Sequence, residues 1–162
     1  MAEVFISYAR EDQGFARKLR DALTADNRTV WMDETGIQPT AEWLKTIFEN
    51  IEASDNFLFL ITPDSVVSTY ARKEIDHAAL NHKRMVPIFY RAVPDDDVPE
   101  AVGKYQRIDF TGVDSLDAKF VKLIDALDTD LEWVEALNRL LVRAKHWEGK
   151  KRTTVYYFAA RI

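Results

Sequence analysis

The sequence predicts an α/β fold, an open five-stranded parallel sheet with helices on both faces. Short segments rich in β-branched and aromatic residues alternate with segments whose apolar residues recur at helical spacing. The segment "NFLFLIT" at 56–62 is continuously apolar, which is typical of a central parallel strand covered on both faces. The chain has 162 residues, enough for one domain with a core of its own.

Each element has a local signal. The first helix places Phe15, Leu19 and Leu23 at helical spacing, and Gly36 with Pro39 makes the segment after the second strand a loop. The expected strands are 3–8, 28–33, 56–62, 84–90 and 105–110. The expected helices lie within 10–26, 41–53, 68–82 and 115–127.

The pattern changes after the fifth strand and its helix. Residues 128–148 carry an apolar stripe at helical spacing, and the last ten residues are apolar and end abruptly. We therefore expect one domain at 1–127. At 128–162 we expect an extra C-terminal helix and the start of a linker or further domain, in a truncated chain.

Composition argues against several classes of function. The net charge is −5 and no Lys/Arg-rich run is present, so direct nucleic-acid binding is not expected. The chain has no cysteine, and His77 and His82 are five residues apart rather than four, so no metal site is expected. The N-terminal segment "MAEVFISYARED" is neither a signal peptide nor a membrane span. We expect a cytoplasmic protein without membrane association.

The fold class indicates where a ligand site should lie. Open parallel sheets bind ligands at the carboxyl ends of their strands, which draws attention to the loops after Tyr8, Asp33 and Thr62. Glu74 follows Tyr70 by four residues, so the carboxylate and the ring share neighbouring surface of one helix. From spacing alone, Glu74 is most simply an exposed helix acid paired with a neighbouring Arg or Lys, and Tyr70 is a packing residue.

Three segments carry a resemblance to a known family. They are "FISYARED", "WMDETGIQPTAEWLKTIFENIEASDNFLFLITPDSVVS" and "YARKEIDHA". In this order they resemble a bacterial Toll/interleukin-1 receptor (TIR) domain over about residues 3–127. The resemblance implies a flavodoxin-like five-stranded parallel sheet. It also implies the front end of a longer, NAD-cleaving protein of antiviral defence.

Active members of that family cleave NAD at the nicotinamide–ribose bond, using a glutamate on the third helix. By motif position this residue is Glu74. An aromatic residue and then a cysteine commonly precede it in the family, whereas this chain has Tyr70 and Ala71. The loop after the second strand corresponds to the family's BB loop, which often has Gly after its Pro where this chain has Thr40.

The resemblance implies a substrate site around Glu74 and no cofactor, because NAD is itself the substrate. Nicotinamide leaves as a neutral base, so no general acid is required. A carboxylate near the ribose can stabilise the positive charge that develops there. Tyr70 is expected to stack on nicotinamide, Arg10 to pair with the pyrophosphate and Trp43 to shape the loop side. The expected substrate-binding residues are Ser7, Tyr8, Arg10, Asp33, Ile37, Trp43 and Tyr70.

Two functions fit these residues. The first is an NAD glycohydrolase that gives ADP-ribose or its cyclic form and is activated by homotypic TIR–TIR assembly, with filaments as one form. The second is a non-catalytic adaptor that acts through the same self-association. Glu74 favours the enzyme, since a pure scaffold needs no acid at that position.

Overall fold

A computed structural model describes residues 3–34, 40–112 and 115–129, together with Leu140, Arg143 and Trp147. The chain divides into two compact units, 1–123 and 124–162, and the first holds all five strands. The extra helix and linker expected at 128–162 lie almost wholly outside the described residues, where only the three isolated positions are seen to be helical. The expected boundary at residue 127 stays a prediction.

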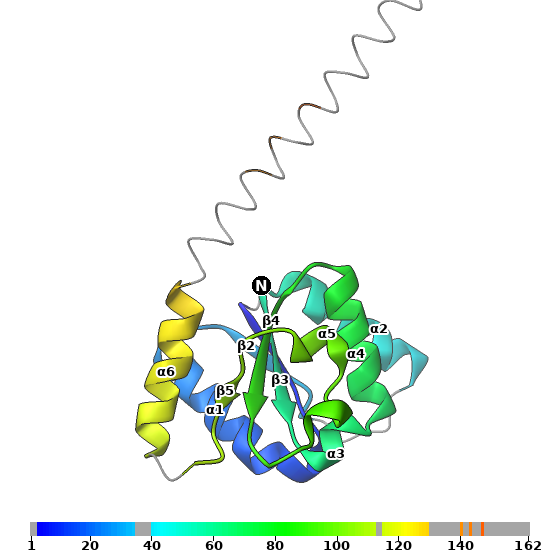
Figure 1. Ribbon diagram of the computed structural model, residues 1–162. Coiled ribbons are helices and arrows are strands. Elements are labelled where there is room, and N and C mark those ends of the chain that lie inside the picture. Colours follow the sequence, from blue (N-terminus) through cyan, green and yellow to red (C-terminus); the bar gives the residue numbers. More distant parts are fainter. Residues whose placement is uncertain are drawn as a thin grey trace, which may run out of the picture. The chain divides into compact units, whose positions relative to one another are not determined.

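The sheet of the first unit has five parallel strands in the order β2-β1-β3-β4-β5 (Figure 1). This is the flavodoxin-like order, which confirms the expected fold class. The strands are β1 (Val4–Ser7), β2 (Val30–Met32), β3 (Asn56–Ile61), β4 (Arg84–Phe89) and β5 (Ile108–Asp109). The edge strand β5 is shorter than the expected 105–110, since only two residues pair with β4.

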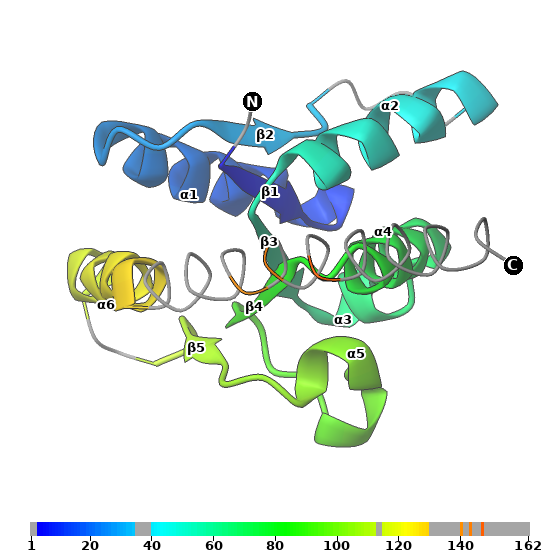
Figure 2. The same cartoon turned by 90° about the horizontal axis from the view of Figure 1, so that it is seen from above.

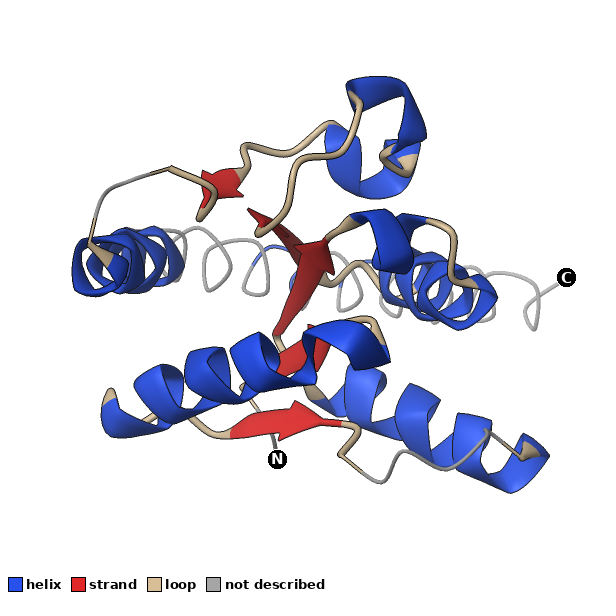
Figure 3. Ribbon diagram, turned by 90° about the horizontal axis from the view of Figure 1, so that it is seen from below, coloured by secondary structure: helices blue, strands red, loops and turns tan. Residues whose placement is uncertain are grey.

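Helices cover both faces of this sheet. Seen from above, α1 lies to one side of the strands and α2 and α4 lie to the other (Figure 2), and the strands run between these layers when seen from below (Figure 3). The helices are α1 (Gln13–Ala25), α2 (Ala41–Ala53), α3 (Pro63–Val66), α4 (Thr69–Leu80), α5 (Glu100–Gly103) and α6 (Leu116–Thr129). Two 3₁₀ turns, η1 (Arg10–Asp12) and η2 (Asp95–Asp97), complete the described elements.

The core is centred on β3, whose six residues are all buried. Phe57 and Phe59 pack with Ile51 of α2 and Ile75 of α4 in one apolar cluster. Alternate strand residues such as Leu58 point to the opposite face, which carries α1. Covering on both faces explains why the β3 sequence is continuously apolar.

The segment after β3 breaks into two helices. Thr62 and Ser65 form a capping box at the start of α3. Ser68 then caps α4, accepting a hydrogen bond from the Ala71 amide at 3.2 Å. The second cap starts a new helix, α4, which carries Glu74.

Candidate active site at the carboxyl edge of the sheet

A pocket of about 480 Å³ opens where β1, β2 and β3 end. The strand order reverses between β1 and β3, and sheets of this kind bind ligands at that point. Six of the expected site residues line the pocket, namely Ser7, Tyr8, Arg10, Asp33, Tyr70 and Glu74. The topology thus brings together residues from the first strand, the end of the second and the fourth helix.

The Glu74 carboxylate is held by Ser7. The Ser7 hydroxyl donates a hydrogen bond to Glu74 Oε2 across 67 positions of sequence. Ser7 is the buried last residue of β1, so its hydroxyl is fixed by the sheet. Glu74 is partly buried, and within the described part of the chain it forms no ion pair. The interpretation from helical spacing alone, of Glu74 as an exposed acid paired with a neighbouring cation, is therefore wrong, because this side chain lines the pocket.

The surroundings of Glu74 change its protonation. Burial raises the pKa of Glu74 to about 7, although the Ser7 hydrogen bond works in the opposite direction and the negative charge of Asp33 adds to the rise. A carboxyl group that titrates near neutrality in a pocket is typical of a functional site. Near neutral pH this group is therefore divided between its neutral and anionic forms.

Asp33 is fixed from two sides at the end of β2. The Tyr8 hydroxyl donates to the Asp33 carbonyl, and Trp43 Nε1 donates to Asp33 Oδ2 at 3.2 Å. Burial is the largest of the effects that raise the pKa of Tyr8, so this hydroxyl stays protonated and remains a donor. Trp43 packs against Trp31, with ring centroids 6.4 Å apart, and is not among the described residues that line the pocket. Trp43 contributes to the pocket indirectly, because its hydrogen bond helps to hold the side chain of Asp33, which lines the pocket.

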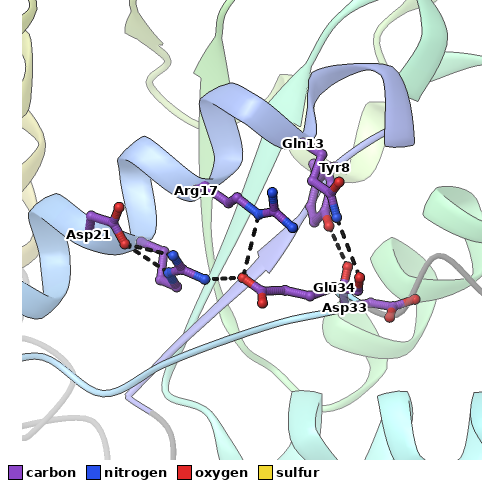
Figure 4. A network of polar contacts seen from close by, with 7 residues as sticks. Tyr8, Gln13, Arg17, Asp21, Asp33 and Glu34 are labelled. Carbon is purple, nitrogen blue, oxygen red and sulfur yellow. Dashed lines mark hydrogen bonds and ion pairs between the residues drawn. The ribbon is translucent and has the colours of Figure 1, made fainter.

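A polar network ties the end of β2 to α1 (Figure 4). Arg20 donates to the Glu34 carboxylate, and Arg17 Nε lies 3.9 Å from the same carboxylate. Gln13 Nε2 donates to the Glu34 carbonyl at 3.5 Å. Together with the Tyr8 contact, these interactions fix the position of Asp33 relative to β1.

Tyr70 and Arg10 complete the sides of the pocket. The Tyr70 ring is 41% exposed, so a planar ligand can reach it, and Lys73 Nζ lies 5.6 Å from its centroid. Arg10 lies exposed on the 3₁₀ turn after β1. The remaining expected substrate-binding residue, Ile37, lies outside the described residues.

Several residues near the pocket escape sequence reasoning. Asp64 and Ser68 line it from the segment between β3 and α4. Asp12 is buried beside it and accepts hydrogen bonds from Thr62 and Arg91. The position of Asp64 just after a strand was an available signal, but nothing in the sequence pairs Asp12 with Arg91.

The described residues contain no group of three or more His, Cys, Asp or Glu side chains placed to hold a metal ion. In the same described ranges, the structure has no helix with the length and apolar character needed to cross a membrane.

The family model for the TIR domain matches residues 4–124. The chain belongs to the TIR domain family. The match covers all five strands and the pocket described above. A search of curated protein sequences found no matching relative.

Solved structures share the fold at low sequence identity. The TIR domain of the Toll-related receptor TRR-2 of Hydra magnipapillata is 19% identical with a TM-score of 0.66, over 79% of this chain and 99% of that one. The TIR domains of the activated Roq1 resistosome, which recognises the pathogen effector XopQ, are 22% identical with a TM-score of 0.52, over 85% and 81%. The CMP N-glycosidase BcmB of Clostridium botulinum is 16% identical with a TM-score of 0.54, over 76% and 98%.

Proposed function

We propose that this TIR domain is an NAD glycohydrolase that cleaves the nicotinamide–ribose bond, releasing nicotinamide and either ADP-ribose or cyclic ADP-ribose. The observation that carries the proposal is the Glu74 carboxylate, held by Ser7 inside the pocket at the strand-order reversal. Bond cleavage leaves nicotinamide neutral and builds positive charge on the ribose. The ribose carbon then bonds to the oxygen of a water molecule, which loses a proton, to give ADP-ribose, or to the adenine of the same molecule to give the cyclic form. An anion fixed beside that ribose stabilises the transition state more than the ground state.

The state of Glu74 suits this chemistry. Its pKa near 7 reflects a poorly solvated carboxylate, and an anion in such surroundings interacts strongly with a nearby positive charge. The nicotinamide ring of bound NAD is itself cationic, so substrate binding favours the ionised form of Glu74. The Tyr70 ring, exposed on the same helix, offers a surface on which nicotinamide can stack.

A structural neighbour supports the reaction class. BcmB is a CMP N-glycosidase, and its overall fold resembles that of this chain. Cleavage of an N-glycosidic bond is therefore compatible with this arrangement of strands and helices. The identity of the base and of the sugar nucleotide rests here on the TIR family membership and on the Glu74 pocket.

The direct test is product analysis. Purified protein is incubated with NAD, and the products are separated by chromatography and identified by mass spectrometry. We expect nicotinamide together with ADP-ribose or its cyclic form from the wild type, and from Glu74→Gln amounts of both that are lower by about 100-fold or more. Wild-type protein that is folded and concentrated but leaves NAD intact would favour the adaptor function.

We further propose that activity depends on self-association in defence signalling. The Roq1 TIR domains belong to an activated resistosome, so a TIR fold can operate within an assembly. A second copy can exclude water from a pocket that is open in one copy. Specific activity should then rise over a hundredfold range of protein concentration, in parallel with light scattering. A constant specific activity from a monomer would contradict this requirement.

A further inference from the structure

The charges that line the Glu74 pocket suit the cationic nicotinamide ring of NAD better than its anionic pyrophosphate. The described lining residues carry four carboxyl groups, on Glu11, Asp33, Asp64 and Glu74, and one guanidinium, on Arg10. This balance favours the cationic nicotinamide ring but repels the pyrophosphate, which is anionic at neutral pH. A pyrophosphate bound near this pocket therefore needs a further cation.

Arg91 is placed to supply that cation. It follows β4 at the carboxyl edge of the sheet. Its Nη2 atom lies 2.7 Å from Asp12 Oδ1 and 2.5 Å from Asp64 Oδ2. Asp64 lines the pocket, so a single carboxylate connects the Arg91 guanidinium to the cavity.

The two carboxylate partners of Arg91 differ in how firmly they are held. The Asp12 side chain is 3% exposed and also accepts a hydrogen bond from Thr62 Oγ1 at 2.6 Å. The Asp64 side chain is 42% exposed, and that of Arg91 is 44% exposed. Exposed ion pairs are weak, whereas breaking a pair that has a buried member leaves that charge uncompensated. Asp12 is therefore the anchor of Arg91, and Asp64 is the partner that can be exchanged.

The guanidinium also has donors to spare. Both ion pairs use Nη2, and among the described residues Nε and Nη1 of Arg91 have no hydrogen-bond or ion-pair partner. A guanidinium presents a planar fork of donors that matches two phosphate oxygens. Arg91 can thus bind a phosphate in place of Asp64 while it keeps its contact with Asp12.

We propose that Arg91 is a phosphate-binding residue of this pocket. Arg91 keeps its ion pair with Asp12, breaks its ion pair with Asp64, and binds the pyrophosphate of a dinucleotide instead. Asp64, which lines the pocket, pairs with Arg91 and therefore competes with the phosphate for its guanidinium. The choice of a dinucleotide as the ligand rests on the proposed function. The test does not depend on that function, because binding of ADP-ribose can be measured without turnover.

The test is calorimetric titration of the full chain with ADP-ribose. Arg91→Lys keeps a positive charge beside the buried Asp12 but loses the planar fork, and we expect the Kd to rise about tenfold. Asp64→Asn weakens the competing contact and removes a negative charge, so the Kd should fall about threefold. The matched control is Arg107→Lys, because Arg107 also pairs with an exposed aspartate, Asp95, at 2.8 Å. It should leave the Kd unchanged.

Each outcome has a defined meaning. Circular dichroism checks the fold of every variant, and Asp64→Asn keeps the test valid if Arg91→Lys does not fold. Equal affinity in wild type and Arg91→Lys, weaker binding by Asp64→Asn, or no binding of millimolar ADP-ribose by the wild type overturns the inference.

Substrate comparison separates this inference from the proposed function. In a protein that cleaves NAD, Arg91→Lys should raise the KM for NAD and leave the cleavage of nicotinamide riboside, which has no phosphate, unchanged. If ADP-ribose binds through Arg91 but NAD is not cleaved, the proposed function fails and the inference stands. If NAD is cleaved and Arg91→Lys has the wild-type KM, the inference fails alone.

Discussion

Two pockets near the strand ends hold their charged groups in opposite ways. In the larger one, the partly buried Glu74 carboxylate accepts a hydrogen bond from Ser7 and forms no ion pair within the described part of the chain. The smaller pocket, of about 250 Å³, lies beside α5 and is bordered by Arg107. Arg107 pairs with Asp95 at 2.8 Å, has a side chain that is 50% exposed, and lies over the Phe89 ring at 4.6 Å.

The two pockets differ in the free energy needed to keep the charged group ionised. A solvated, paired charge such as Arg107 is stable in its ionised form and contributes little to the free energy of folding. Removing water from a carboxylate without supplying a cation destabilises its ionised form, and the pKa of Glu74 is raised for this reason. Such a cost is expected where the group acts on a ligand, and this distinguishes the two pockets.

The largest effect should come from Glu74→Gln. The amide keeps an oxygen that can accept the Ser7 hydrogen bond but removes the negative charge opposite the ribose. We expect NAD cleavage to fall by about 100-fold or more, with an unchanged circular dichroism spectrum. Arg107→Gln is the matched control in the second pocket. A folded Glu74→Gln protein with wild-type turnover would remove Glu74 from the mechanism.

The next effect is on pH dependence. Because the proposed reaction needs the ionised carboxylate, kcat/KM should rise with pH through a midpoint near 7. Bound NAD is cationic at the nicotinamide, so the midpoint for kcat should lie lower. A pH profile that is flat between 5 and 8 would show that the ionisation of Glu74 does not limit the reaction.

Stability should change with pH in the opposite direction. The folded protein keeps the Glu74 proton up to about pH 7, whereas an unfolded glutamate loses it near 4.5. Between these values the folded state binds more protons, so the free energy of unfolding falls as pH rises. The fall is roughly 1–3 kcal/mol, since partial exposure reduces the full effect. Urea unfolding at pH 5 and pH 8 measures it, and Glu74→Gln should lack this contribution.

Smaller effects should come from the two neighbours of Glu74. Ser7→Ala removes a hydrogen bond that lowers the pKa of Glu74, so the kcat/KM midpoint should move to higher pH. Asp33→Asn removes a negative charge that raises this pKa and keeps an oxygen for Trp43, so the midpoint should move to lower pH. Shifts in the same direction would contradict this account of the pocket.

The smallest effect should come from the second pocket. Arg107→Ala removes an exposed ion pair and a contact with Phe89, which together are worth about 1 kcal/mol or less. We expect unchanged NAD turnover and a small decrease in the urea midpoint. If Arg107→Ala lost as much activity as Glu74→Gln, the second pocket would also take part in the reaction, and this comparison of the two pockets would be wrong.

The local pattern of the sequence determined the fold class and the location of the candidate site. Apolar runs and helical spacing report which face of each segment is covered, so the sheet, central β3 and most helices were predictable. The rule that ligands bind at strand ends directed attention to the loops after Tyr8, Asp33 and Thr62, and the pocket lies there. The motif order indicated the TIR family, which the family model confirms.

The tertiary structure alone decided the state of the charged groups. Helical spacing alone favoured an exposed Glu74 and only the family resemblance favoured a site residue, whereas the fold brings its carboxylate to Ser7, 67 positions away. Asp12 meets Arg91 only because β1 and β4 end at the same edge of the sheet. Burial and long-range pairing depend on which elements pack together, and a local sequence pattern reports only the covered face of its own segment.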